Sequence, residues 1–172
     1  MMEASIRVLY VDDETGLLEI EKMFLEESGE FSVTIIDSTP AALDLLNKKK
    51  FDAIVSDYQM AGMDGIQFLV EVRARFGKIP FILFTGKGRE EVVIKAINNE
   101  ANFYLQKGGE TESQFAELLH KIKTATDHRR DEEQVIYLNR LYAVLSATNK
   151  AIVRIKDKKE LLKEICRIVI DI

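Results

Sequence analysis

Three aspartates, a threonine and a lysine each stand directly after a short apolar run of this 172-residue sequence. The runs and the residues that follow them read Val11-Asp12-Asp13, Val55-Ser56-Asp57, Phe84-Thr85 and Leu105-Gln106-Lys107. If the runs are parallel strands, their carboxyl ends meet at one edge of a sheet, where open α/β folds bind ligands. Carboxylates, a hydroxyl and an ammonium group gathered there suit the transfer of a phosphoryl group.

Three carboxylates in one crevice need a cation beside them. Two carboxylates about 4 Å apart repel each other by roughly 4 kcal/mol at an effective dielectric constant near 20. Mg²⁺, which prefers oxygen ligands and keeps several waters, would relieve this repulsion. We then expect Asp57 to act as the nucleophile toward phosphorus, with Lys107 and Thr85 contacting phosphate oxygens. Each residue alone is better explained as a cap, a turn residue or a solvated charge, so the interpretation depends on their ordered combination.

The segments that must position these residues alternate between strand and helix patterns. Buried strands are predicted at Ile6–Val11, Phe31–Ile36, Ala53–Asp57, Phe81–Thr85 and Phe103–Gln106. Helices are predicted between Leu17 and Leu25, after Ser38-Thr39-Pro40, at Ile66–Phe76 and at Glu90–Asn98. This alternation favours an α/β fold with a parallel sheet covered by helices on both faces.

No glycine or proline follows Gly109, which favours a long helix in the remaining chain. Its first part is expected to pack on the sheet through Phe115, Leu118, Leu119 and Ile122. Farther along, apolar or seam residues recur at steps of three and four, as in a coiled coil, although a helix packed within a larger domain fits nearly as well. These residues are Val135, Leu138, Tyr142, Leu145, Asn149 and Ile152.

A second C-terminal helix is predicted to start at Asp157, which with Glu160 resembles a capping box. Its apolar face has nothing left in the sequence to cover it, so we expect the chain to be cut inside a further domain. The predicted division is therefore a domain over residues 1–124, a helical linker over 125–156 and the start of another domain over 157–172.

Composition excludes several classes of function. The 24 basic and 29 acidic side chains give a net charge of −5 and form no basic stripe, which argues against a nucleic-acid partner. No apolar stretch reaches the roughly 18 residues that span a bilayer, and the start lacks a signal-peptide pattern, so no membrane association and a cytoplasmic location are expected. The single Cys166 cannot form an internal disulfide and is expected to be a buried apolar residue.

These residues together resemble the receiver domain of two-component response regulators, over about residues 5–124. The matching features are the acidic pair in Val11-Asp12-Asp13-Glu14, the stretch from Asp57 to Gly65, Thr85-Gly86, and Tyr104 three residues before Lys107. The resemblance implies a flavodoxin-like, doubly wound sheet of five parallel strands in the order 2-1-3-4-5, followed here by a C-terminal helical extension.

The resemblance also implies a phosphoacceptor site rather than a stand-alone enzyme. Asp57 would take a phosphoryl group from a phosphohistidine on a histidine kinase or phosphotransfer protein. Mg²⁺ would be held by Asp13, Asp57 and the backbone carbonyl of Gln59, with Asp12 acting through water.

Two further residues would report the phosphorylation. The resemblance implies that Thr85 moves toward the phosphate and that the ring of Tyr104 turns inward. These movements would reshape the face formed by the fourth helix, the fifth strand and the fifth helix, as a local charge biases a two-state element.

The chain departs from the receiver pattern in two places. Ala61 stands where the family usually has proline, which predicts a less stiff loop after Asp57. Gly108-Gly109 follows Lys107 in place of the usual cis-proline. Because a cis bond before glycine costs about 2.5–4 kcal/mol, we predict a trans Lys107–Gly108 peptide or a rearranged loop.

The C-terminal stretches at 141–146 and 160–166 resemble the lead-in to a GAF-type sensory domain. This weaker resemblance implies a receiver upstream of sensory and kinase modules in a parent protein of the hybrid histidine kinase type. A homodimer through the C-terminal helix is expected from the seam.

Three alternatives remain beside the receiver interpretation. A haloacid-dehalogenase-like phosphatase places its nucleophile and a second Asp two residues apart after the first strand, whereas here the aspartates are adjacent and position 59 is Gln. A flavin or nucleotide binder would need a glycine-rich loop after the first strand, which is missing. A receiver-like interaction module that never uses phosphate would be expected to lose Asp57, Lys107 or the acidic pair, and all are present.

Overall fold

The computed structural model describes residues 5–86, 90–108, 110–154 and 157–171, and in this part strands and helices alternate as far as the fifth strand. The strands are β1 (Ile6–Val11), β2 (Phe31–Ile36), β3 (Ala53–Ser56), β4 (Phe81–Thr85) and β5 (Phe103–Gln106). The helices are α1 (Thr15–Glu26), α2 (Thr39–Lys48), α3 (Gly65–Phe76), α4 (Glu90–Asn98), α5 (Thr111–Arg154) and α6 (Lys158–Asp171). The expected elements are confirmed, with Asp57 one residue beyond the end of its strand.

The five strands form one parallel sheet in the order β2-β1-β3-β4-β5, which confirms the doubly wound fold. β1 pairs with β2 on one side and with β3 on the other, so the strand order reverses at β1. In the β1–β3 register Val11 lies opposite Ser56. The residues that follow these two positions therefore leave the sheet side by side, at the edge where such folds bind ligands.

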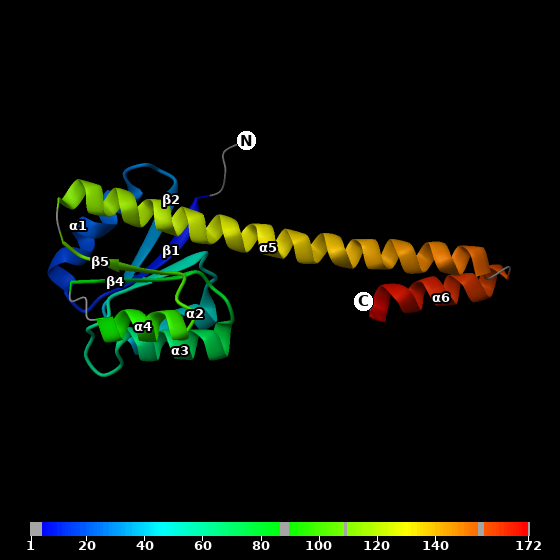
Figure 1. Cartoon of the computed structure of the whole chain (residues 1–172), viewed down its shortest axis with the longest axis horizontal. Coiled ribbons are helices and arrows are strands. Elements are labelled where there is room, and N and C mark those ends of the chain that lie inside the picture. The colour runs from blue at the N-terminus through cyan, green and yellow to red at the C-terminus, as the bar shows by residue number, and fades with distance from the viewer. Residues whose placement is uncertain (1–4, 87–89, 109, 155–156, 172) are drawn as a thin grey trace. The chain divides into compact units, whose positions relative to one another are not determined.

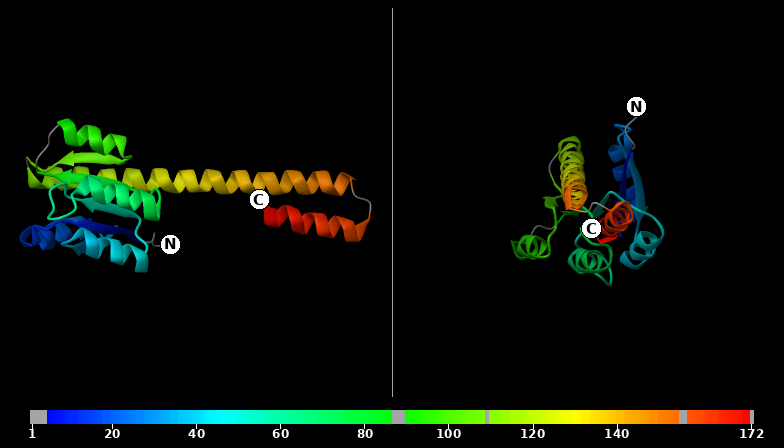
Figure 2. Two further views of the ribbon diagram at one scale, coloured as in Figure 1. Left: turned by 90° about the horizontal axis from the view of Figure 1, so that it is seen from below. Right: turned by 90° about the vertical axis from the view of Figure 1, so that its right-hand side faces the viewer.

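Helices cover both faces of the sheet, and each face has its own apolar core (Figures 1 and 2). Alternate strand residues point to opposite faces, as with Val8 and Tyr10 against Leu9 and Val11. One core is completed by α1 and by the first part of α5, through Leu18, Leu25, Phe115, Leu118 and Ile122. The other is completed by α2, α3 and α4, through Ala42, Leu43, Leu46, Phe68, Leu69, Val72 and Ala96. The strands are nearly continuous apolar runs because both faces are covered.

The C-terminal part begins within α5, which is one helix of 44 residues. The chain separates into two compact units, residues 1–127 and 128–172. In the second unit α6 begins after Asp157, whose Oδ1 accepts hydrogen bonds from the backbone N–H groups of Lys159 and Glu160 (2.9 and 3.0 Å). The predicted start of this helix is confirmed, and α6 lies alongside the last turns of α5 (Figure 2).

Two further expectations have clear outcomes. The described residues contain no cis peptide bond, so the Lys107–Gly108 peptide is trans as predicted. Cys166 is exposed rather than buried, because α6 turns residues such as Ile168 inward and leaves Cys166 on its outer side. Within the described chain no helix is long and apolar enough to cross a membrane.

Candidate phosphoacceptor site

Backbone hydrogen bonds tie the strand ends together at the carboxyl edge of the sheet. The Asp57 N–H donates to the carbonyl of Val11 (2.9 Å), so the acid after β3 is held against the end of β1. The Lys107 N–H donates to the carbonyl of Thr85 (2.7 Å), which joins the ends of β5 and β4 in the same way. Residues far apart in the sequence therefore meet at one edge, as predicted.

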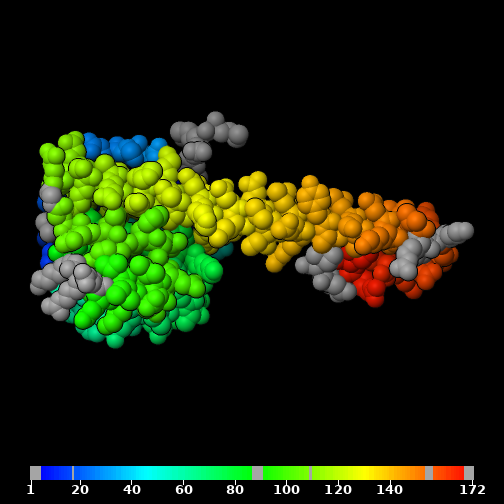
Figure 3. Space-filling view, in the orientation of Figure 1, coloured from blue at the N-terminus to red at the C-terminus, as the bar shows by residue number. Residues whose placement is uncertain are grey.

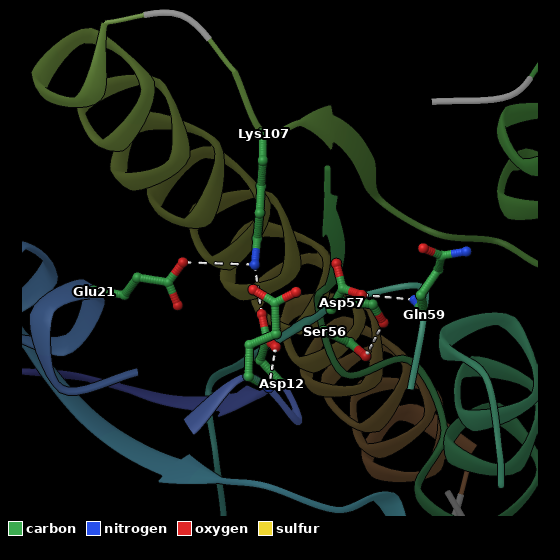
Figure 4. A network of polar contacts seen from close by, with 7 residues as sticks. Asp12, Glu21, Ser56, Asp57, Gln59 and Lys107 are labelled. Atoms are coloured by element: carbon green, nitrogen blue, oxygen red, sulfur yellow. Dashed lines mark hydrogen bonds and ion pairs between the residues drawn. The ribbon is translucent and has the colours of Figure 1, made fainter. Parts of the chain in front are cut away.

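Lys107 lies between acidic side chains (Figure 4). Its Nζ is 2.5 Å from Asp12 Oδ2 and 3.5 Å from Glu21 Oε1. Burial works to lower the pKa of Lys107, but the hydrogen bond to Asp12 and the charges of Glu21, Asp12 and Asp57 outweigh it and raise the pKa. Lys107 is therefore a firmly protonated cation at the centre of an acidic site.

Asp57 is nearly buried, with 9% of its surface exposed. Its Oδ2 accepts a hydrogen bond of 2.6 Å from the backbone N–H of Gln59. Burial is the largest effect on the pKa of Asp57 and raises it. Lys107, the Gln59 N–H and a hydrogen bond from the Thr85 side chain oppose this, and the charge of Asp12 adds to it. The carboxylate is thus poorly solvated, which favours its reaction with an electrophile or pairing with a cation.

Asp12 and Asp13 have different surroundings although they are neighbours. Asp12 is buried, and its two oxygens accept from Lys107 Nζ and from the Glu14 N–H (2.9 Å). Asp13 is exposed, and its Oδ2 accepts from the backbone N–H of Ala61 (2.9 Å). Proline at position 61 has no N–H and could not make this bond. The departure from the usual receiver proline therefore adds a tie between the loop after β3 and Asp13.

The loop after Asp57 packs closely against the strand that it leaves. The Gly65 N–H donates to the Tyr58 carbonyl (2.9 Å), and a Cβ at Gly65 would lie 2.3 Å from the Asp57 carbonyl oxygen. Asp64 caps α3 in a capping box with Gln67. These contacts fix the loop that runs from Asp57 to Gly65. A surface pocket beside it is lined by Asp13 and by the loop residues Tyr58, Gln59, Met60, Ala61 and Asp64.

The two proposed reporter residues lie on the paired strands β4 and β5. Thr85 ends β4 and is buried. Tyr104 on β5 is half-buried and packs against the core cluster of α2, α3 and α4. Burial and the charge of Asp57 both raise the pKa of Tyr104, and its hydroxyl has no hydrogen-bond partner among the described residues. Tyr104 is therefore within reach of the electrostatic influence of Asp57.

The oxygen atoms at this site have the chemistry that Mg²⁺ binding requires. Within the described residues no three Asp, Glu, His or Cys side chains form a ready metal cluster. Mg²⁺ in proteins commonly uses only one or two carboxylates and completes its shell with water and phosphate oxygens. Asp13 and Asp57 each give one oxygen to a backbone N–H and keep further lone pairs, so this set fits Mg²⁺.

Glu21 is a charged member of this network that the sequence interpretation missed. It lies on α1 three residues after Leu18 and four before Leu25, both of which are buried. The sequence feature that could have identified it is an acidic residue on the otherwise apolar face of an amphipathic helix. Its pairing with Lys107, 86 positions away on the far side of β5, depends on the tertiary structure.

Comparisons with known proteins agree with this geometry. Residues 8–123 match the family model of the response regulator receiver domain. The chain is 31% identical over 124 residues to the transcriptional regulatory protein FixJ of Bradyrhizobium diazoefficiens, covering 72% of this chain and 60% of FixJ. It is 31% identical to the chemotaxis protein CheY-3 of Vibrio cholerae, covering 62% of this chain and 84% of CheY-3.

A solved structure shows the same arrangement. The CheY-like receiver domain protein of Methanospirillum hungatei superposes with a TM-score of 0.68 at 26% identity, covering 75% of this chain and 99% of that one. The match reaches 60% of FixJ and 47% of the response regulator Rre1 of Synechocystis, so the relatives contain segments beyond the matched region. With five parallel strands in the order 2-1-3-4-5 and acids and a lysine at their ends, the chain belongs to the response regulator receiver domain family.

Proposed function

We propose that Asp57 is the phosphoacceptor of this receiver domain and that Lys107 and Thr85 assist the transfer. The observation that carries the proposal is the meeting of Asp57, Thr85 and Lys107 at one sheet edge, where the Asp57 N–H is bonded to the Val11 carbonyl and the Lys107 N–H to the Thr85 carbonyl. A nucleophile, a hydroxyl donor and a mobile cation are the groups that phosphoryl transfer requires.

The proposed transfer is a displacement at phosphorus. A carboxylate oxygen of Asp57 bonds to the phosphorus of a partner's phosphohistidine as the phosphorus–nitrogen bond breaks. The electron pair of that bond stays on the imidazole, which takes a proton from solvent. Lys107 and the Thr85 hydroxyl then contact the phosphoryl oxygens on Asp57.

Asp13, Asp57 and the Gln59 carbonyl would hold Mg²⁺, with Asp12 acting through water. Asp12 suits an indirect role because Lys107 and the Glu14 N–H already use both of its oxygens. The ion would supply positive charge beside the transferred group.

The switch would run through Thr85 and Tyr104 to the face of α4, β5 and the start of α5. Side chains of α4 and of the first turns of α5 lie on the face drawn in Figure 3. New negative charge on Asp57 would draw the Thr85 hydroxyl, which already hydrogen-bonds the Asp57 carboxylate, toward the phosphoryl oxygens, and Tyr104 would follow into the space beside it. A partner that reads this face would then distinguish the two states.

The output of the whole protein is also a proposal. FixJ is named a transcriptional regulatory protein and CheY-3 a chemotaxis protein, so proteins with this receiver domain serve different processes. From its GAF-like helical segments, we propose that this receiver belongs upstream of sensory and kinase modules. The partners would be a histidine kinase or phosphotransfer protein and a second copy joined through α5.

Incubation with acetyl phosphate and Mg²⁺, followed by intact-mass analysis, tests the phosphoacceptor. The wild type should gain one phosphoryl group, and D57N should gain none. D37N is the matched control, because Asp37 follows β2 at the same sheet edge and is exposed. An equal adduct in D57N, or none in any protein, would contradict the proposal and favour a receiver-like module that does not use phosphate.

A further inference from the structure

Glu21 is a buried carboxylate on the apolar face of α1, with 6% of its surface exposed. Its neighbours on the same stripe, Leu18 and Leu25, complete the core between α1 and the sheet. Burying a carboxylate among such residues costs free energy unless a cation pairs with it. The cation available to Glu21 is Lys107, the lysine of the phosphoacceptor site.

The pairing of Glu21 is incomplete. Oε1 lies 3.5 Å from Lys107 Nζ, whereas Oε2 is buried without a hydrogen-bond partner in the described structure. The buried hydroxyl of Tyr10 also lacks a partner at full bonding geometry, although Tyr10 and Glu21 are close enough to shift each other's pKa. A core that only had to be stable would gain by replacing this polar pair with apolar side chains.

Glu21 and Asp57 attract the Lys107 ammonium from different directions. In Figure 4 Glu21 lies on one side of the Lys107 ammonium and Asp57 on the other. Asp12 anchors the ammonium between them. Lys107 thus offers one positive charge to three carboxylates.

We propose that Glu21 is a positioning residue that holds Lys107 toward α1 and so limits its movement to a phosphoryl group on Asp57. The inference rests on the proposed function, since it assigns a partner to the same lysine. A phosphoryl group adds negative charge at Asp57, and Lys107 can approach it only by giving up part of its pairing with Glu21. The charge of Glu21 therefore opposes the phosphorylated state.

The consequence is a testable change in affinity for a phosphoryl mimic. In E21Q the competing charge is removed while size and shape are nearly kept, so Lys107 is freer to turn toward Asp57. With Mg²⁺ at saturation, calorimetric titration with beryllium fluoride should show binding about fivefold tighter than in the wild type. The matched control is E19Q, which removes an exposed charge from the same helix and should leave the affinity unchanged.

A double-mutant cycle with Lys107 distinguishes an effect of Glu21 on the position of Lys107 from a general effect on the structure. If Glu21 acts through Lys107, then E21Q should leave the affinity unchanged in a K107M background. Equal affinity of E21Q and wild type, or the same gain with and without Lys107, would overturn the inference. If the wild type bound no beryllium fluoride at all, the proposed function itself would fall.

A structure of the wild type with beryllium fluoride supplies a test that needs no variant. The Lys107 Nζ to Glu21 Oε1 separation should lengthen from 3.5 Å as the ammonium turns to the fluoride atoms. An unchanged separation with beryllium fluoride bound at Asp57 would overturn the inference even if E21Q did not fold.

Discussion

The acidic side chains of this site have different contacts because they are buried to different extents. Asp12 and Glu21 are buried and paired with Lys107, whereas Asp13 is exposed and bonded to the loop at Ala61. Asp13 is exposed and is one of the proposed Mg²⁺ ligands, whereas the buried Asp12 holds the lysine. The same residue type therefore has two roles because the surroundings differ.

The raised pKa of Glu21 predicts how its replacement changes the stability of the fold. Burial is the largest effect and raises the pKa above the ordinary value of 4.5, against the opposing charge of Lys107. The folded state therefore binds a proton more readily than the unfolded state, and the charged form of Glu21 destabilises the fold at neutral pH. E21Q removes this cost, so its free energy of unfolding should exceed that of the wild type at pH 7.

The stability difference between E21Q and the wild type should depend on pH in one direction. As the pH falls through the raised pKa of Glu21, the wild type gains stability relative to E21Q, and the two should converge below the ordinary pKa of 4.5, where Glu21 is protonated in both the folded and unfolded states. Urea unfolding of both proteins at several pH values measures the difference, with E19Q as the exposed control. A difference between E21Q and wild type that is constant with pH would contradict the prediction.

The start of α3 packs tightly against the end of β3, and the closest backbone contact is at Gly65. A Cβ there would meet the Asp57 carbonyl oxygen at 2.3 Å and a Leu83 methyl at 2.8 Å. G65A should therefore lower the free energy of unfolding by about 3 kcal/mol and weaken Mg²⁺ binding, because the loop from Asp57 must shift.

Gly16 is the matched control for this substitution. It lies in α1, and a Cβ there would meet nothing within 4 Å. G16A should keep or raise stability, by up to about 1 kcal/mol, because alanine favours the helix. Thermal unfolding of both variants measures the contrast; equal effects of G65A and G16A would contradict the packing argument.

The sequence could predict the elements because buried parallel strands and amphipathic helices have distinct periods. It also predicted that Asp12, Asp57, Thr85 and Lys107 would share an edge, since parallel strands bring their carboxyl ends together. It could not predict the Ala61 bond to Asp13, because a loop conformation decides which N–H faces the carboxylate. Glu21 was missed for the related reason that its partner is set by how α1 packs near the end of β5.

The whole molecule joins a receiver unit to a helical unit, each with its own exposed surface. In the helical unit the seam residues Leu138, Tyr142 and Leu145 are 40%, 70% and 50% exposed. Apolar residues at steps of three and four on one helix are typical of a coiled coil with a second copy.

This seam predicts the oligomeric state. The full chain should sediment as a dimer at micromolar concentration, and L138E with L145E should make it a monomer by placing like charges in the seam. Mass analysis with acetyl phosphate should still show one adduct per chain of the variant, because all of the proposed site residues lie between positions 12 and 107. A monomeric wild type would contradict the dimer.

The central claim is that Asp57 carries the phosphoryl group, and chemical trapping tests it most directly. Borohydride reduces an aspartyl phosphate to homoserine, so the phosphorylated protein should yield a peptide with homoserine at position 57 and at no other aspartate. The product should require both acetyl phosphate and Mg²⁺. Homoserine at Asp12 or Asp13, or a phosphoryl group that resists borohydride, would contradict the account.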